Sequence, residues 1–100
     1  MSKPLEIRPA AREDFLDASE WYLSESVALK DTFVKMARET VSSVRERPRS
    51  FPVVFGPSVR RAIVKKFPFS VYFIDDGDRI IILSIFHDSR NPIIWHGRID

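Results

Sequence analysis

Hydrophobic and polar positions form their clearest pattern over residues 69–74 and 79–86, two runs rich in β-branched and aromatic residues. Between them, the sequence DDGD at positions 75–78 is typical of a tight turn, because Gly77 accepts the positive φ that such a turn requires. The two runs therefore predict a β-hairpin whose loop is formed by Asp76 and Gly77.

In this register Phe73 faces Ile80, and the side chains separate into two faces. One face is apolar apart from one serine and must be covered; it comprises Phe69, Val71, Phe73, Ile80, Ile82, Ser84 and Phe86. The other face mixes polar and apolar side chains; it comprises Ser70, Tyr72, Ile74, Arg79, Ile81, Leu83, Ile85 and His87. Such a mixture is too polar for a core and too apolar for full solvation, so we expect a half-open surface that carries the function.

Two amphipathic helices are predicted before the hairpin. The first begins near Ala10, after a short strand at residues 5–8 that Pro9 ends, and finishes around residues 24–26. The second ends before Pro48, and the short connection between them predicts an antiparallel helical hairpin. The apolar stripes consist of Ala11, Phe15, Ala18 and Tyr22 in the first helix and of Phe33, Met36, Ala37, Thr40, Val41 and Val44 in the second.

Residues 47–57 contain three prolines and a glycine, which favours an ordered, extended connector without a strand or helix. A strand is then predicted over residues 59–67. It contains two adjacent basic pairs, Arg60-Arg61 and Lys65-Lys66. Because neighbouring residues of a strand point to opposite faces, each pair should send one charge to each side of the sheet.

The order β-α-α-β-β-β predicts a single α+β domain over residues 1–100. An N-terminal short strand and a helical hairpin should pack on an antiparallel sheet of three to four strands. One hundred residues suffice to bury a core without a disulfide or metal.

Composition narrows the classes of function. The chain has no cysteine, so disulfides, thiolate metal sites and a cysteine nucleophile are excluded. It has no apolar run of the ~20 residues that a membrane span requires, and its N-terminus lacks the apolar core of a signal peptide. These features predict a cytoplasmic protein without membrane contact.

Charge is unevenly distributed along the chain. The formal net charge is only +2, with 16 basic and 14 acidic residues, which is a weak indication of acidic partners. Residues 45–66 contain seven basic residues and one acidic residue, whereas the first 31 residues contain seven acidic ones. The chain therefore has an acidic beginning and a basic middle.

An ordered set of motifs spans nearly the whole chain. It comprises Ala18, Trp21 and Tyr22, the connector at 47–57, Arg60-Arg61, Phe67-Pro68-Phe69, Val71-Tyr72-Phe73, residues 80–86, His87, Arg90-Asn91-Pro92, Trp95 and Arg98. With these motifs the sequence resembles the ParE branch of the RelE/ParE toxin superfamily, whose members are often described as plasmid-stabilisation proteins.

The resemblance implies the toxin of a type II toxin-antitoxin system, held inactive in a hetero-oligomer by a ParD-like antitoxin. ParE-type members are described as DNA gyrase inhibitors, whereas RelE-type members are ribosome-dependent mRNA endonucleases. Candidate partner-binding residues are Arg60, Arg61, Lys65, Lys66, Tyr72, His87, Arg90, Trp95 and Arg98.

The nuclease alternative requires a base, an acid and cations around the phosphate. Ser70 occupies the position of an arginine on the third strand of RelE-type toxins, and a hydroxyl cannot neutralise a phosphate. His87 with Lys65 and Arg61 is the remaining candidate catalytic set. We therefore expect protein binding without catalysis; the nuclease and a non-toxic interaction module stay as alternatives.

Other ligands are not indicated. For the pair His87 and His96, no residue, Asp88 included, supplies a third ligand at a dependable spacing, so no metal and no cofactor are expected. No recognised nucleic-acid motif is present, and direct DNA binding is not expected. Trp21 and Trp95 are interpreted as packing residues, because tryptophan is usually mostly buried.

Overall fold

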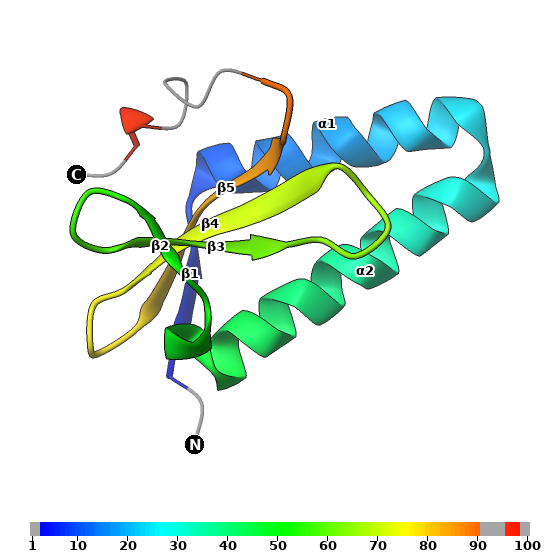
Figure 1. Cartoon of the computed structure of the whole chain (residues 1–100). Coiled ribbons are helices and arrows are strands. Elements are labelled where there is room, and N and C mark those ends of the chain that lie inside the picture. Colours follow the sequence, from blue (N-terminus) through cyan, green and yellow to red (C-terminus); the bar gives the residue numbers. More distant parts are fainter. Residues whose placement is uncertain (1–2, 91–95, 99–100) are drawn as a thin grey trace.

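Two helices cover one side of a five-stranded sheet in the computed structural model (Figure 1), which describes residues 3–90 and 96–98. The elements are β1 (Leu5–Ile7), α1 (Pro9–Glu25), α2 (Val27–Glu46), the 3₁₀ turn η1 (Pro48–Ser50), β2 (Val53–Phe55), β3 (Val59–Ile63), β4 (Phe69–Asp75) and β5 (Ile80–His87). The predicted α+β class and the order of strand, helical hairpin and sheet are confirmed, while the sheet has five strands instead of the predicted three to four.

A single residue joins the two helices. Ser26 ends α1, where its N–H donates to the Tyr22 carbonyl at 3.0 Å, and it caps α2, where its Oγ accepts from the Leu29 N–H at 2.9 Å. At the other end of α1, Pro9 occupies the first turn, where its missing N–H costs no helical bond. The helical hairpin predicted from the two apolar stripes is confirmed.

The strands lie in the order β1-β5-β4-β3-β2, and β1 pairs in parallel with β5 while the other neighbours are antiparallel. The prediction of an extended connector over residues 47–57 is wrong, because η1 and β2 lie within it. Pro48 opens η1, and Pro52 and Pro57 lie on either side of β2, outside its three residues.

Strand β3 is shorter than predicted. It ends at Ile63, and the chain turns through Lys65 and Lys66, whose φ is 72°. The Val64 N–H then donates to the Phe69 carbonyl at 2.9 Å and closes the turn. The second basic pair therefore lies in a turn and does not divide between the faces of the sheet, contrary to the prediction.

The β4–β5 hairpin forms at the predicted place with a shifted register. Phe73 pairs with Ile82 instead of Ile80. The Asp76 carboxylate accepts the backbone N–H groups of Asp78 and Arg79, each at 3.0 Å, which moves the turn one residue along the chain. A shift of two in register leaves each side chain on its predicted face, so the faces near the turn are as predicted.

A bulge at Leu83 changes the faces farther along β5. Phe73 pairs with Ile82, but the preceding residue Tyr72 pairs with Ser84, so Leu83 is an extra residue without its own partner in β4. One extra residue reverses the alternation beyond it.

Beyond the bulge, Ile85 and His87 lie on the helix side of the sheet and Phe86 lies on the other side, contrary to the prediction. His87 pairs with Phe69, and the two rings meet edge to face with centroids 5.0 Å apart. Phe86 belongs to the apolar cluster on the opposite face. The functional face predicted from the sequence therefore does not include His87.

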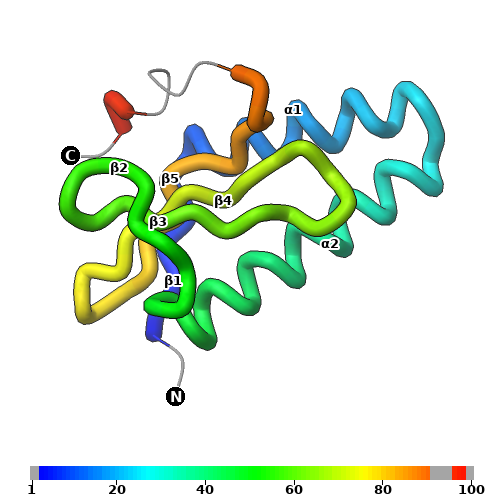
Figure 2. The backbone as a smooth tube through the Cα atoms, in the orientation of Figure 1, coloured from blue at the N-terminus to red at the C-terminus, as the bar shows by residue number. Residues whose placement is uncertain are grey.

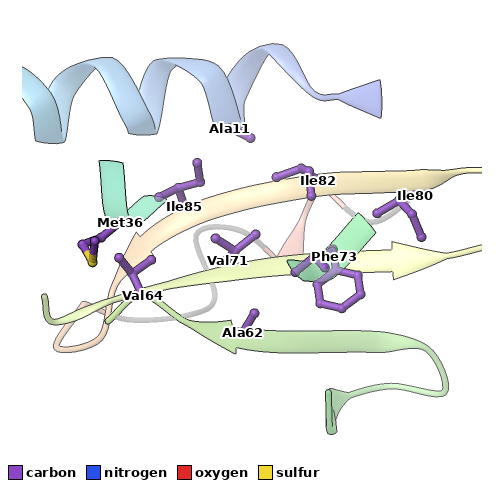
Figure 3. Packing of buried hydrophobic residues seen from close by; sticks show 10 residues of the cluster. Ala11, Met36, Ala62, Val64, Val71, Phe73, Ile80, Ile82 and Ile85 are labelled. Atoms are coloured by element: carbon purple, nitrogen blue, oxygen red, sulfur yellow. The ribbon is translucent and has the colours of Figure 1, made fainter. Parts of the chain in front are cut away.

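The main core lies between the helices and the sheet. Figure 3 shows Ala11 of α1 and Met36 of α2 together with side chains of β3, β4 and β5. An aromatic group extends this core, with Phe33 fully buried and 5.2 Å from each of Phe67 and Phe69, measured between ring centroids. These contacts fix the positions of α1 and β5, which border a groove described below.

Candidate functional site

The face of the sheet opposite the helices is more closed than the sequence predicts. Its centre is a buried apolar cluster formed by Val59, Ile81, Leu83 and Phe86. Tyr72 and Ile74 are partly exposed at its margin. Figure 2 shows the C-terminal residues 96–98 beside the β2–β3 hairpin, where the His96 and Phe55 rings stack at 3.8 Å.

A polar cluster on this face contains Arg61, Ser70 and Asp88. The Arg61 Nε donates to Ser70 Oγ at 2.9 Å, and Ser70 Oγ donates to Asp88 Oδ1 at 2.7 Å. The Arg61 guanidinium also lies 3.4 Å from Asp88 Oδ1. Ser70 is fully buried, whereas the Arg61 and Asp88 side chains are 35% and 31% exposed, so the buried hydroxyl joins two partly exposed charged groups. The charge of Arg61 is thus compensated within the chain.

Tyr72 lies beside this cluster. Burial raises the pKa of the Tyr72 hydroxyl and Asp88 raises it further, while Arg61 and the hydrogen bond with Ser70 lower it, leaving a net increase. The hydroxyl is therefore protonated at neutral pH and serves as a hydrogen-bonding group.

The three residues of the candidate nuclease set are not brought together. Arg61 pairs with Tyr72 and faces away from the helices, whereas His87 lies on the helix side with Phe69. The His87 Nδ1 lies 3.1 Å from the Ser89 N–H, which donates to it. Lys65 is exposed in the turn after β3. The sheet itself therefore separates the cation from the imidazole.

The other predicted partner-binding residues are dispersed. Arg60 points to the helix side and donates to the Phe51 carbonyl. Arg90 lies with its guanidinium carbon 4.9 Å from the centre of the Phe86 ring. Lys66 is exposed in the turn after β3. Trp95 lies outside the described residues.

Arg98, which is predicted to bind a partner, joins the C-terminal residues 96–98 to α1. Its guanidinium donates to Asp14 Oδ2 at 2.6 Å and to the Leu83 carbonyl at 3.3 Å. The same Asp14 oxygen accepts from Ser84 Oγ at 3.0 Å and from the Ile85 N–H at 3.3 Å. β1 pairs with β5 only as far as Ile82, so beyond this point Asp14 provides the hydrogen-bond acceptor for the Ile85 N–H of β5.

A groove with a volume of about 710 Å³ runs between α1 and the segment that follows β5. Its lining is Asp14, Asp17, Ala18, Trp21, Tyr22, Glu25, Leu29, Pro68, Phe69, Ile85, His87, Ser89 and Arg90. Trp21 is 61% exposed and Leu29 is 37% exposed, so two large apolar side chains remain open to solvent there. The α1 wall is acidic, and Arg90 on the other wall is basic.

Interpreting Trp21 as a packing residue is wrong. Among the aromatic rings of the described residues, its ring meets the edge of Tyr22 alone, with centroids 5.1 Å apart. The sequence contains a signal that would have found the groove. Asp14, Asp17, Trp21 and Glu25 recur at i, i+3, i+7 and i+11, so they form a second helical stripe beside the buried one.

Among residues 3–90 and 96–98, no group of three His, Asp or Glu side chains is arranged to hold a metal ion. Neither described helix is long and apolar enough to cross a membrane.

Comparisons with known proteins identify relatives. Residues 5–92 match the model of a family described as "ParE toxin of type II toxin-antitoxin system, parDE". A solved structure described as "Chromosomal ParDE TA system from P. aeruginosa" is similar with a TM-score of 0.73 and 21% identity, over 86% of this chain and 96% of that chain. At this identity the similarity establishes a common fold. No curated protein sequence matches the chain significantly.

Proposed function

Because the chain belongs to the ParE toxin family of type II toxin-antitoxin systems, we propose that it inhibits DNA gyrase by protein binding and is neutralised by a cognate ParD-like antitoxin. The predicted resemblance to this family is confirmed. The gyrase target, the antitoxin and a cytoplasmic site of action are the parts that we propose.

The cluster of Arg61, Ser70 and Asp88 is the observation that carries this proposal. Cleavage of RNA requires free cations that converge on the phosphate. Arg61 already donates to Ser70 and faces the Asp88 carboxylate at 3.4 Å, so a phosphate would have to displace both. An added anion would also lie next to Asp88 and be repelled by it.

Separation of the titratable groups supports the same conclusion. A general base must lie within hydrogen-bond reach of the proton it removes, while the cation holds the phosphate beside it. His87 and Arg61 lie on opposite faces of the sheet, and the protonated Tyr72 supplies no base at neutral pH. The described residues therefore favour binding over endonuclease chemistry.

We propose that the antitoxin occupies the groove beside α1. An apolar side chain of the antitoxin would bury the exposed faces of Trp21 and Leu29, as apolar anchors do in other interfaces. A basic residue of the antitoxin would face Asp17 and Glu25 on the acidic wall. An otherwise acidic antitoxin should therefore place its few basic residues in this groove.

Induction of the chain in bacterial cells tests the function. Induced alone, it should arrest growth, and co-expression with the antitoxin should restore growth and yield a complex larger than the toxin in size-exclusion chromatography. Normal growth without any antitoxin would contradict a toxin. Growth arrest with cleaved ribosome-bound mRNA and unchanged DNA supercoiling would favour the nuclease.

A further inference from the structure

Strand β2 is an apolar strand that is exposed on both of its faces. Val53, Val54 and Phe55 are 44%, 45% and 37% exposed, although consecutive residues of a strand point to opposite sides. At the other edge of the sheet, all three residues of β1 are half-buried. Consecutive exposed apolar residues in a strand are unfavourable unless another surface covers them.

Among the described residues, no strand pairs with the outer backbone edge of β2. β2 is the last strand in the order of the sheet, so its pairing in the described structure is with β3 alone. Val53 lies opposite Arg60, and the Arg61 N–H donates to the Pro52 carbonyl at 3.1 Å. Pro52 and Arg61 are therefore a hydrogen-bonded pair, and in antiparallel strands such pairs alternate with pairs that share no hydrogen bond. Val53 and Arg60 form the next pair, so the N–H and C=O of Val53 point away from β3.

The edge strand β2 is short and its register with β3 shifts between Val53 and Phe55, but one usual protection against strand addition is absent. Exposed edges normally carry charged side chains, and β2 has none on its three residues. The two flanking prolines, Pro52 and Pro57, limit the accessible length of the edge to a short segment between them. Such an edge suits a short extended peptide.

Charge identifies the chemistry of the occupant. The segment of the sequence that contains β2, residues 45–66, has seven basic residues and one acidic residue, and two of the basic residues, Arg49 and Arg61, already face the carboxylates of Asp75 and Asp88. Within residues 3–90 and 96–98, the side chains of Arg47 and Arg60 form no ion pair with a carboxylate. A second copy of the chain would bring two basic regions together, whereas an acidic segment would be attracted.

We propose that β2 accepts an extended acidic segment of a partner protein as an additional strand of the sheet. Backbone hydrogen bonds to the outer edge at Val53 would hold the segment, and its apolar side chains would cover the exposed parts of Val53 and Val54. Acidic side chains would face Arg47 and Arg60. This site is independent of the proposed function: β2 lies at one edge of the sheet, and the groove adjoins β5, three strands away, so both can be occupied at once.

Fluorescence anisotropy and amide hydrogen exchange on the purified chain, alone or with its antitoxin, test the proposal. The probe is a labelled short peptide that alternates glutamate and valine; control peptides replace glutamate by lysine or carry N-methyl groups on the backbone. The glutamate peptide should bind and slow exchange at the Val53 amide. The lysine and N-methylated peptides should bind about tenfold more weakly or not at all.

Two variants separate the edge from general electrostatics. Val54→Glu places a charge on β2 without changing the backbone and should weaken binding of the glutamate peptide about tenfold. Val27→Glu adds the same charge at a side chain that is 65% exposed on α2 and should weaken it little. Equal weakening by both variants, equal binding of the N-methylated peptide, protection of β5 instead of β2, or no binding would each overturn the proposal. A dimer paired through β2 would overturn it as well, because a second copy would then be the occupant.

Discussion

Replacement of Trp21 by alanine should weaken antitoxin binding strongly while leaving the toxin folded. Trp21 is 61% exposed and lines the groove beside α1. A tryptophan side chain carries up to ~250 Å² of surface, so about 150 Å² remains for a partner to cover. At ~25 cal/mol per Å², full coverage is worth up to about 4 kcal/mol.

The expected effect is smaller than that ceiling, because binding also costs the entropy of ordering side chains at the interface. Truncation of an aromatic anchor commonly costs ~2 kcal/mol or more, which corresponds to a Kd increased about 30-fold. The free energy of unfolding should change by less than ~1.5 kcal/mol, since the aromatic interaction that the substitution removes within the chain is the edge-to-face pair with Tyr22.

Isothermal titration calorimetry with the cognate antitoxin measures the Kd, and urea unfolding measures stability. Val27→Ala is the matched control, because Val27 is 65% exposed on α2 and does not line the groove. An unchanged Kd for Trp21→Ala, or an equal weakening by both variants, would refute the assignment of the groove to the antitoxin.

Three further predictions concern the polar contacts. Arg98→Ala should lower the free energy of unfolding by about 2–3 kcal/mol in urea titrations, because it leaves the Asp14 carboxylate, only 14% exposed, without its cation. Adding Asp14→Asn to this variant should recover part of the lost stability. If the effects of the two substitutions on the free energy of unfolding were fully additive, the contact between the two side chains would be contradicted. Ser70→Ala should cost about 1–2 kcal/mol in the same titration, because the buried hydroxyl joins two charged groups, and an unchanged stability would contradict this role. Burial raises the pKa of Asp75, but the hydrogen bonds and charge of Lys3, the Gly77 N–H and the charge of Arg49 lower it more. The stabilisation by the Asp75 carboxylate is therefore present above the unfolded pKa of about 3.9 and disappears as pH falls through the folded value. The free energy of unfolding of Asp75→Asn should depend more weakly on pH below ~4, and identical pH profiles of the two chains would contradict this role of Asp75.

The elements with a strong local period can be predicted from the sequence. The stripes of α1 and α2 follow the helical repeat, and their buried members, such as Phe33, Ala37 and Val44, are those that the stripe predicts. The place of the β4–β5 turn is also predictable, because glycine at a turn with positive φ is a local requirement; φ is 96° at Gly77.

The faces of β5 and the edge strand cannot be predicted in this way. Residues 80–86 are apolar with a single exception, so alternation cannot reveal an inserted residue. The bulge at Leu83 lies next to a tertiary contact, the hydrogen bond from the Ile85 N–H to Asp14, which no local pattern shows. β2 could not be predicted because it is only three residues long. In so short a segment, the sequence does not show whether a proline lies beside a strand, where it is tolerated, or within the strand, where it is not.

The candidate site is only partly predictable for the same reason. Arg61, Ser70 and Tyr72 share one face as the pattern predicts, since β3 and the near half of the hairpin keep regular alternation. The face of the sheet predicted for His87 is wrong, because this residue follows the bulge. The groove at Trp21 combines residues of α1 with residues more than 40 positions away, and only the helical stripe of acids indicates it.

A DNA supercoiling assay with purified gyrase tests the central claim most directly. The toxin alone should inhibit supercoiling, the antitoxin added in excess should restore it, and Arg61→Ala should inhibit no less than the unchanged chain if its fold is retained, because Arg61 acts within the chain. Supercoiling that proceeds normally in the presence of the toxin, together with cleavage of ribosome-bound mRNA that Arg61→Ala abolishes, would contradict the account.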